Sequence, residues 1–204
     1  MHRRHLANVL TSSRFVLSPI FAVVFYLLDR FPEFAVVGIS LLWIIFVLIE
    51  LSDVLDGLVA RRYGTVSDVG KILDPFADVV SKVTYFACFL VAGVVPLWFL
   101  LIILYREFGI ILIRMILYRD GLAMAARTAG KLKTWFYGLT AAVGLFILSL
   151  DTVGGAPVFG LERVGPLWQD VTMLVLLIIT AGLSIGSFLQ YLSFFVSERR
   201  KGSR

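Results

Sequence analysis

Four aspartates stand close together in the sequence, at the junction between two strongly apolar segments. Asp53 and Asp56 are three residues apart, and Asp74 and Asp78 are four residues apart, so each pair projects from one side of its segment if that segment is helical. Carboxylates that converge beside hydrocarbon repel one another and resist desolvation, so they require bound cations or partial protonation. The simplest chemistry for this arrangement is the binding of divalent metal.

Other residue types restrict the kind of metal that the chain could bind. The single cysteine, Cys88, lies in an apolar run, and the two histidines, His2 and His5, lie at the N-terminal end of the sequence. Neither a disulfide nor a zinc site is therefore expected. Oxygen ligands alone favour hard divalent ions, so Mg²⁺ or Mn²⁺ is the expected metal.

The composition indicates the class of protein. The 204-residue chain is 59% hydrophobic and 16% charged, and its mean hydropathy is +0.92, which is typical of a polytopic all-α membrane protein. A spanning helix needs about 20 apolar residues, so six transmembrane helices use most of the chain and a single membrane domain, residues 1–204, is expected. The predicted spans cover approximately residues 8–28, 34–51, 72–94, 96–117, 132–150 and 171–196.

The distribution of basic residues predicts the orientation in the bilayer. Only Arg30 and Arg163 fall in the outer loops, whereas the other seventeen of the nineteen Lys and Arg residues fall in inner segments or in the spans that adjoin them. This bias predicts that both termini and the four aspartates lie on the cytoplasmic side. Arg14 interrupts the first apolar run, so that run is expected to be a retained helix and not a cleaved signal. Anionic lipid headgroups account for the net charge of +5 without nucleic acid.

The residues between the two aspartate pairs suit a phosphate-rich ligand. Gly57, Ala60 and Gly70 leave the backbone open to close approach by a bulky group, and Arg61 adds a cation of fixed charge. Carboxylates that hold hard metals, together with small residues and an arginine, suit a pyrophosphate whose oxygens bridge the ions.

Three polar positions also have purely structural interpretations. Asp74 precedes Pro75 and so fits a helix N-cap with proline at the first helical position. Arg14 could extend along the helix to the cytoplasmic headgroups instead of entering a nucleotide site. Glu107 is expected to pair with a neighbouring arginine, because an unpaired acid within a span is costly.

The complete stretch from Asp53 to Asp78 reads D-x₂-D-G-x₂-A-R-x₈-G-x₃-D-x₃-D, and in this pattern the chain resembles the CDP-alcohol phosphatidyltransferase family. Every position of that family's signature is filled. The matching residues are Asp53, Asp56, Gly57, Ala60, Arg61, Gly70, Asp74 and Asp78.

The resemblance implies a fold, an activity and a cofactor. It implies the six-helix CDP-alcohol phosphotransferase fold and an enzyme that transfers a phosphatidyl group from CDP-diacylglycerol to an alcohol, releases CMP and uses two Mg²⁺ or Mn²⁺ ions. Residues matching Asp53, Asp56 and Asp74 would bind metal, and Asp78 would bind metal and act as the base. Gly57, Ala60, Arg61 and Gly70 would border the cytidine diphosphate.

Similarity beyond the signature points to one branch of the family. Asn8, Thr11 and Arg14 form an N-x-x-T-x-x-R arrangement that looks like the first helix of phosphatidylglycerophosphate synthases, where it would help bind CDP-diacylglycerol. The stretches REFGIILIR, GKLKT and SFLQYLS are similar to that branch as well. One position departs from it: the branch usually has lysine directly after the last aspartate, whereas here Val79 follows and the next lysine is Lys82. Because Lys82 comes four residues after Asp78, the two side chains could face the same way on a helix.

The acceptor implied by this branch is glycerol 3-phosphate, whose phosphate needs a cationic site of its own. Arg106 and Arg114 are eight residues apart, or about two helical turns, and Lys133 begins the following span. Positive-inside bias explains Arg106 poorly, because an arginine within a span needs a partner or an aqueous cavity. Arg106, Arg114 and Lys133 are therefore the predicted phosphate clamp.

Other functions remain open on the sequence alone. The same chemistry could serve inositol phosphate, serine or phosphatidylglycerol as acceptor. A prenyltransferase also uses D-x-x-D pairs, although its two motifs normally lie far apart, and a divalent-cation transporter could line its path with aspartates. The family resemblance further suggests a homodimer in a bacterial inner membrane.

Overall fold

The computed structural model describes residues 2–63, 68–119, 128–155, 158–159 and 165–202, and these residues contain six α-helices, one short 3₁₀-helix and no strand. Within the helices, side chains are described for residues 12–55, 73, 75–119, 132–155 and 167–200. The elements are α1 (His2–Arg30), η1 (Pro32–Phe34), α2 (Ala35–Tyr63), α3 (Asp68–Val91), α4 (Leu97–Arg119), α5 (Thr128–Val153) and α6 (Leu167–Gly202).

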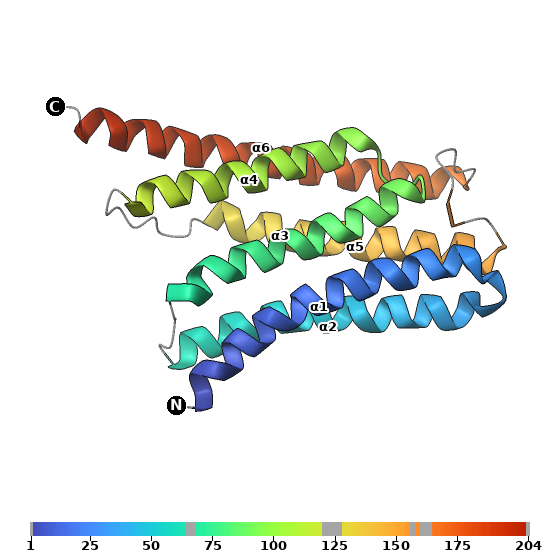
Figure 1. Ribbon diagram of the computed structural model, residues 1–204. Coiled ribbons are helices and arrows are strands. Elements are labelled where there is room, and N and C mark those ends of the chain that lie inside the picture. Colours follow the sequence, from blue (N-terminus) through green and yellow to red (C-terminus); the bar gives the residue numbers. More distant parts are fainter. Residues whose placement is uncertain (1, 64–67, 120–127, 156–157, 160–164, 203–204) are drawn as a thin grey trace.

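The six helices run lengthwise side by side (Figure 1). Helix α1 packs against α2 and α3, α6 packs against α4 and α5, and α3 joins these two groups through contacts with α4 and α5. The beginning of α1 and the end of α6 lie at the same end of the bundle, together with the end of α2 and the beginning of α3 (Figure 1). The segments that carry the aspartate signature therefore lie at the end of the bundle where both termini lie.

Aromatic side chains fill the centre of the bundle. Tyr85 on α3 is fully buried, and its ring packs against Phe21 of α1 at 5.0 Å and Phe46 of α2 at 5.2 Å between centroids. Phe86, also on α3, packs edge-on against Phe99 of α4 at 5.1 Å. These offset geometries favour aromatic pairs, and they fix the rotation of α3 relative to its neighbours.

The outer surface of the bundle is apolar. Val16, Val36, Leu112 and Ile178 each expose more than half of their side-chain area. A surface of this kind is unfavourable in water and suits the hydrocarbon interior of a bilayer. The helices thus have the pattern of a membrane protein, with large apolar residues both inside and outside.

Four stretches of the described chain are long and apolar enough to span a membrane: Ser12–Arg30, Pro32–Leu55, Leu132–Val153 and Leu167–Arg200. The predicted six helices are confirmed as helices, but six spans are not established by length and composition. Of the other two helices, α4 carries Arg106, Glu107 and Arg114 within its apolar sequence, and the side chains described in α3, at residues 73 and 75–91, form too short a stretch for this comparison.

The helix ends correct one local prediction. Helix α3 begins at Asp68, so Asp74 and Pro75 lie inside the helix and not at its start. The N-cap interpretation of Asp74 is therefore wrong. A proline inside a helix cannot donate the usual hydrogen bond and is normally destabilising, so the packing of α3 must compensate for it.

A tight turn connects α3 to α4. The amides of Val94 and Val95 both donate to the carbonyl of Phe89, at 2.9 and 3.1 Å. Gly93 has a φ of +69°, in the left-handed region that favours glycine. This turn directs the chain back along the bundle and brings α4 beside α3.

Candidate active site

In the first polar cluster, a side chain of α1 contacts the first aspartate of the signature on α2. Arg14 on α1 donates from Nη1 to Oδ1 of Asp53 on α2 at 2.7 Å. The Arg14 side chain is only 2% exposed, whereas that of Asp53 is 36% exposed. Arg14 therefore points into the bundle, and the interpretation that it extends to the lipid headgroups is wrong.

Asp78 on α3 has its own buried cation. Lys82, one helical turn later on α3, forms an ion pair with Oδ1 of Asp78. The Lys82 side chain is 5% exposed and that of Asp78 is 28% exposed, so the carboxylate is the more accessible member of the pair. The spacing of four residues places both groups on the same side of the helix, as the sequence predicted.

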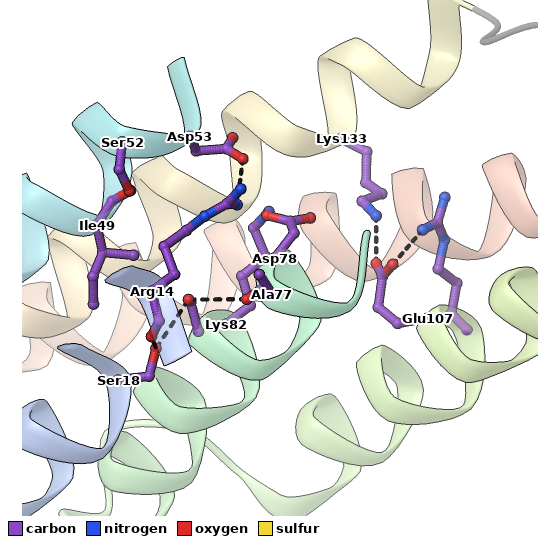
Figure 2. A network of polar contacts seen from close by, with 12 residues as sticks. Arg14, Ser18, Ile49, Ser52, Asp53, Ala77, Asp78, Lys82, Glu107 and Lys133 are labelled. Atoms are coloured by element: carbon purple, nitrogen blue, oxygen red, sulfur yellow. Dashed lines mark hydrogen bonds and ion pairs between the residues drawn. The ribbon is translucent and has the colours of Figure 1, made fainter. Parts of the chain in front are cut away.

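Hydroxyl groups hold α1 and α3 together next to these ion pairs (Figure 2). Ser18 can donate to the carbonyl of Arg14 at 2.7 Å, and Ser81 can donate to the carbonyl of Ala77 at 3.0 Å. Because each hydroxyl has one proton, one of the two donates to its carbonyl while the other donates across to the neighbouring helix. The two hydroxyl oxygens lie 3.0 Å apart and share a hydrogen bond. Because Ser18 and Ser81 are both buried, this contact fixes the distance between the helices that carry Arg14 and Asp78.

Glu50 contributes a third carboxylate beside Asp53 and Asp78. It stands on α2 three residues before Asp53, and it interacts electrostatically with Lys82, Asp78 and Asp53. A Cβ atom at Gly138 of α5 would come within 3.3 Å of its Oε2, so the absence of a side chain at Gly138 leaves room for the carboxylate. In the sequence, only the three-residue spacing to Asp53 indicates that Glu50 could belong to the site. The packing of α5 against α2 determines which groups surround its carboxylate.

A second polar cluster lies between α4, α5 and α6. Glu107 accepts from Nη1 of Arg106 at 2.8 Å through Oε2, and its Oε1 forms an ion pair with Lys133 (Figure 2). Arg106 also donates from Nη2 to Ser187 of α6 at 2.8 Å. All four residues are buried. The predicted pairing of Glu107 with a neighbouring arginine is thus confirmed, and Lys133 is a second partner.

The third member of the predicted phosphate clamp lies apart from the other two. Arg114 is exposed and donates from Nη2 to the hydroxyl of Tyr191 on α6 at 3.3 Å, with its guanidinium carbon 5.6 Å from the centroid of that ring. Arg106 and Lys133 instead share the carboxylate of Glu107. The structure therefore brings together two of the three predicted cations, and it adds an internal anion between them.

Eight predicted site residues have side chains outside the described part of the structure. Their backbones lie within helices, with Asn8 and Thr11 on α1, Asp56, Gly57, Ala60 and Arg61 on α2, and Gly70 and Asp74 on α3.

The described carboxylates can be compared with the needs of hard divalent ions. Asp53 and Asp78 come from two helices and interact with each other electrostatically. Both remain partly exposed, and the contacts with Arg14 and Lys82 involve one oxygen of each. Among side chains that the structure describes, no group of three or more His, Cys, Asp or Glu is arranged to hold a metal. The donor set of Asp53 and Asp78 nevertheless fits Mg²⁺ or Mn²⁺, which prefer carboxylate oxygen.

The chain is similar to known proteins along most of its length. Residues 4–182 match the model of the family described as CDP-alcohol phosphatidyltransferase. The chain is 36% identical over 155 residues to a CDP-diacylglycerol–glycerol-3-phosphate 3-phosphatidyltransferase of Treponema pallidum, covering 74% of this chain and 68% of that protein. It is 35% identical over 148 residues to a Mycobacterium tuberculosis protein named "Probable phosphatidylglycerophosphate synthase", covering 72% of this chain and 68% of that protein.

A third relative, from Bacillus subtilis, has the same name as the Treponema pallidum protein. It is 31% identical over 137 residues, which cover 64% of this chain and 71% of that protein. The family match extends over most of the chain, from the helix that carries Arg14 into the helix that carries Ser187. This chain therefore belongs to the CDP-alcohol phosphatidyltransferase family of enzymes.

Proposed function

We propose that this protein transfers the phosphatidyl group of CDP-diacylglycerol to glycerol 3-phosphate, producing phosphatidylglycerophosphate and CMP. Relatives at 31 to 36% identity with this activity in their names support the choice of substrates. The observation that carries the proposal is the presence of two neighbouring polar clusters in one helical bundle. One cluster offers partly exposed carboxylates, Asp53 and Asp78, and the other holds two buried cations, Arg106 and Lys133.

The carboxylate cluster suits the donor and the proton transfer. The acceptor hydroxyl attacks the β-phosphorus of CDP-diacylglycerol, the bond from that phosphorus to the bridging oxygen breaks, and CMP leaves with that oxygen. Asp78 takes the hydroxyl proton, because its carboxylate is accessible and Lys82 stabilises its charged form. Two divalent ions bound by Asp53, Asp56, Asp74 and Asp78 would neutralise the pyrophosphate charge and polarise the reacting phosphorus.

The cationic cluster suits the phosphate of the acceptor. Arg106 and Lys133 carry two positive charges, and Glu107 supplies one negative charge between them. Nε of Arg106 is buried and has no hydrogen-bond partner among the described residues. The cluster thus has one positive charge in excess and a buried N–H donor, Nε of Arg106, without an acceptor, and both features favour an anionic ligand. A phosphate would supply both the missing charge and the missing acceptor.

The arrangement of the bundle supports a six-span topology with the site on the cytoplasmic side. Helices α3 and α4 have 24 and 23 residues, and about 20 suffice to cross the hydrocarbon. Their ionisable side chains Asp78, Lys82, Arg106 and Glu107 pair with other residues of the bundle, which lowers the cost of placing them in a membrane. The basic residues near both termini favour the cytoplasm for that end, in the inner membrane of a bacterium. We further infer a homodimer from the family resemblance.

An acceptor panel tests the proposed reaction. We expect purified protein with CDP-diacylglycerol to release CMP rapidly with glycerol 3-phosphate and slowly with inositol phosphate, serine or phosphatidylglycerol. CMP release is followed by chromatography, and the lipid product is identified by mass spectrometry. A preference for serine, which carries no phosphate and no net charge, would contradict the role of the cationic cluster. Cation flux into vesicles without CMP release would indicate a transporter.

Replacing Lys133 by Met should raise the KM for glycerol 3-phosphate by about 10- to 100-fold, because a contact between two charged groups is lost. The KM for CDP-diacylglycerol should change by less than about twofold. Arg114→Ala is the comparison variant: Arg114 contacts Tyr191 and not Glu107, so its effect on the same constant should be smaller. If both KM values rise equally in the Lys133 variant, the assignment to the acceptor is wrong.

A further inference from the structure

A single buried tyrosine contacts cations from both polar clusters. Tyr137 lies on α5, one turn after Lys133, and none of its surface is exposed. The Lys133 ammonium lies 4.5 Å from the centroid of its ring, and the Lys82 ammonium, from α3, lies 5.7 Å from the same centroid. Both distances fall within the range of attractive cation–π interactions.

Each of these ammonium groups is also the partner of a carboxylate. Lys82 pairs with Asp78, and Lys133 pairs with Glu107. The ring of Tyr137 therefore contacts the cations of both ion pairs. In a water-poor interior two like charges repel strongly, and an electron-rich ring beside both of them reduces the cost of keeping them close.

The position of the Tyr137 ring is fixed by other contacts. Its hydroxyl shares a hydrogen bond of 2.7 Å with Ser184 of α6, and its ring packs edge-on against Phe86 of α3 at 6.3 Å between centroids. On the next turn of the same helix, the hydroxyls of Thr140 and Thr180 lie 2.8 Å apart and form a second hydrogen bond between α5 and α6. These contacts restrict rotation of the Tyr137 side chain, so its ring can hold the two lysine ammonium groups at fixed positions.

We propose that Tyr137 is a positioning residue that sets the relative placement of the carboxylate cluster and the cationic cluster. The ring holds Lys82 where it pairs with Asp78, and it holds Lys133 where it meets the acceptor's phosphate. This proposal rests on the proposed function, since it assigns Lys133 to that phosphate. It adds a residue that acts on the reaction through its contacts with the two lysines and not through contact with a substrate.

The test compares three substitutions of one residue. Tyr137→Leu and Tyr137→Met remove the ring, whereas Tyr137→Phe keeps the ring and removes only the hydroxyl, which contacts Ser184 and interacts with Glu107. We expect the Leu and Met variants each to raise the KM for glycerol 3-phosphate about tenfold, from the loss of the cation–π contact. The inhibition constant of inorganic phosphate should rise by the same factor, while the KM for CDP-diacylglycerol changes less than about twofold. The Phe variant should restore both constants to near the wild-type values.

Phe99→Leu serves as the matched control for the loss of a buried ring. Phe99 on α4 is fully buried and packs against Phe86 and Trp98, and neither lysine is recorded over its ring. It should lower the thermal stability in detergent without changing either KM. The proposal is overturned if the Leu and Met variants keep the wild-type KM for glycerol 3-phosphate, or if Tyr137→Phe or Phe99→Leu raises it as much.

A direct binding measurement separates this proposal from the proposed function. Binding of inorganic phosphate to the purified wild type and to the three Tyr137 variants is measured by thermal shift, without CDP-diacylglycerol. If the acceptor is a different phosphate ester, wild-type protein will fail to use glycerol 3-phosphate and yet bind phosphate more tightly than the Leu and Met variants. If phosphate binds all four proteins equally, Tyr137 does not position the cationic cluster.

Discussion

Asp78→Asn should reduce turnover by about 10²- to 10⁴-fold, the usual contribution of a general base. Asparagine has nearly the same size as aspartate, so α3 should keep its packing, and Lys82 should lose only its charged partner. The amide cannot accept the acceptor's hydroxyl proton. The measurement is the rate of CMP release at saturating concentrations of both substrates.

The role of Asp78 as a base must be separated from its role as a metal ligand. A variant that has lost only metal affinity should recover when Mg²⁺ or Mn²⁺ is raised, whereas a variant that has lost the base keeps a low kcat at saturating metal. Asp68→Asn is the matched control, since Asp68 is the first residue of α3 and has no predicted part in the reaction. Similar small effects at Asp68 and Asp78 would show that neither is the base.

Removal of divalent ions should abolish activity. Asp53 and Asp78 interact with each other electrostatically, and a pyrophosphate brought beside them would add further negative charge. Arg14 and Lys82 compensate the two aspartates within the protein, so the chain should remain folded without metal while it loses the reaction. Exhaustive dialysis against a chelator, with the metal content checked by mass spectrometry, should reduce CMP release below detection.

Addition of metal provides the control for chelation. Mg²⁺ or Mn²⁺ should restore activity to the dialysed protein, and the same ions should raise its melting temperature even without substrate, because bound cations reduce the repulsion between the carboxylates. Asp53→Asn should weaken this stabilisation. Activity that persists in metal-free protein would rule out the proposed two-ion site.

Local spacing in the sequence predicted some contacts correctly. The pairing of Asp78 with Lys82 follows from four-residue spacing on one helix, and the pairing of Glu107 with Arg106 follows from the cost of an isolated acid in an apolar helix. The six helices were also predictable, because runs of about 20 apolar residues are helical wherever water cannot satisfy the backbone. Most helix ends lie within six residues of the predicted bounds, but α2 continues twelve residues past Leu51 to Tyr63, and α3 ends at Val91, three residues before its predicted end.

Contacts between residues far apart in the sequence were not predictable. Arg14 and Asp53 are 39 positions apart, and Arg106 and Ser187 are 81 positions apart. Each contact depends on how two helices are rotated about their own axes, and the aromatic packing of Tyr85 and Phe86 in the centre of the bundle decides that rotation. From the sequence, the Arg14 side chain could extend to the lipid headgroups or enter the site. The packing of α1 against α2 decides that it points into the bundle.

The predicted phosphate clamp illustrates the same division. By itself the sequence determined the protein class, the helices, the signature and the types of charge on each helix, because these depend on composition and on spacing along one chain. Only the tertiary structure decided that Lys133 and Arg106 share Glu107, that Arg114 lies on Tyr191, and that Tyr137 contacts two lysines. The physical reason is that a buried charged group must pair with a polar group that the packing of the helices places next to it. Which group that is depends on the rotation and the axial offset of neighbouring helices, and these cannot be read from the separation of two residues in the sequence.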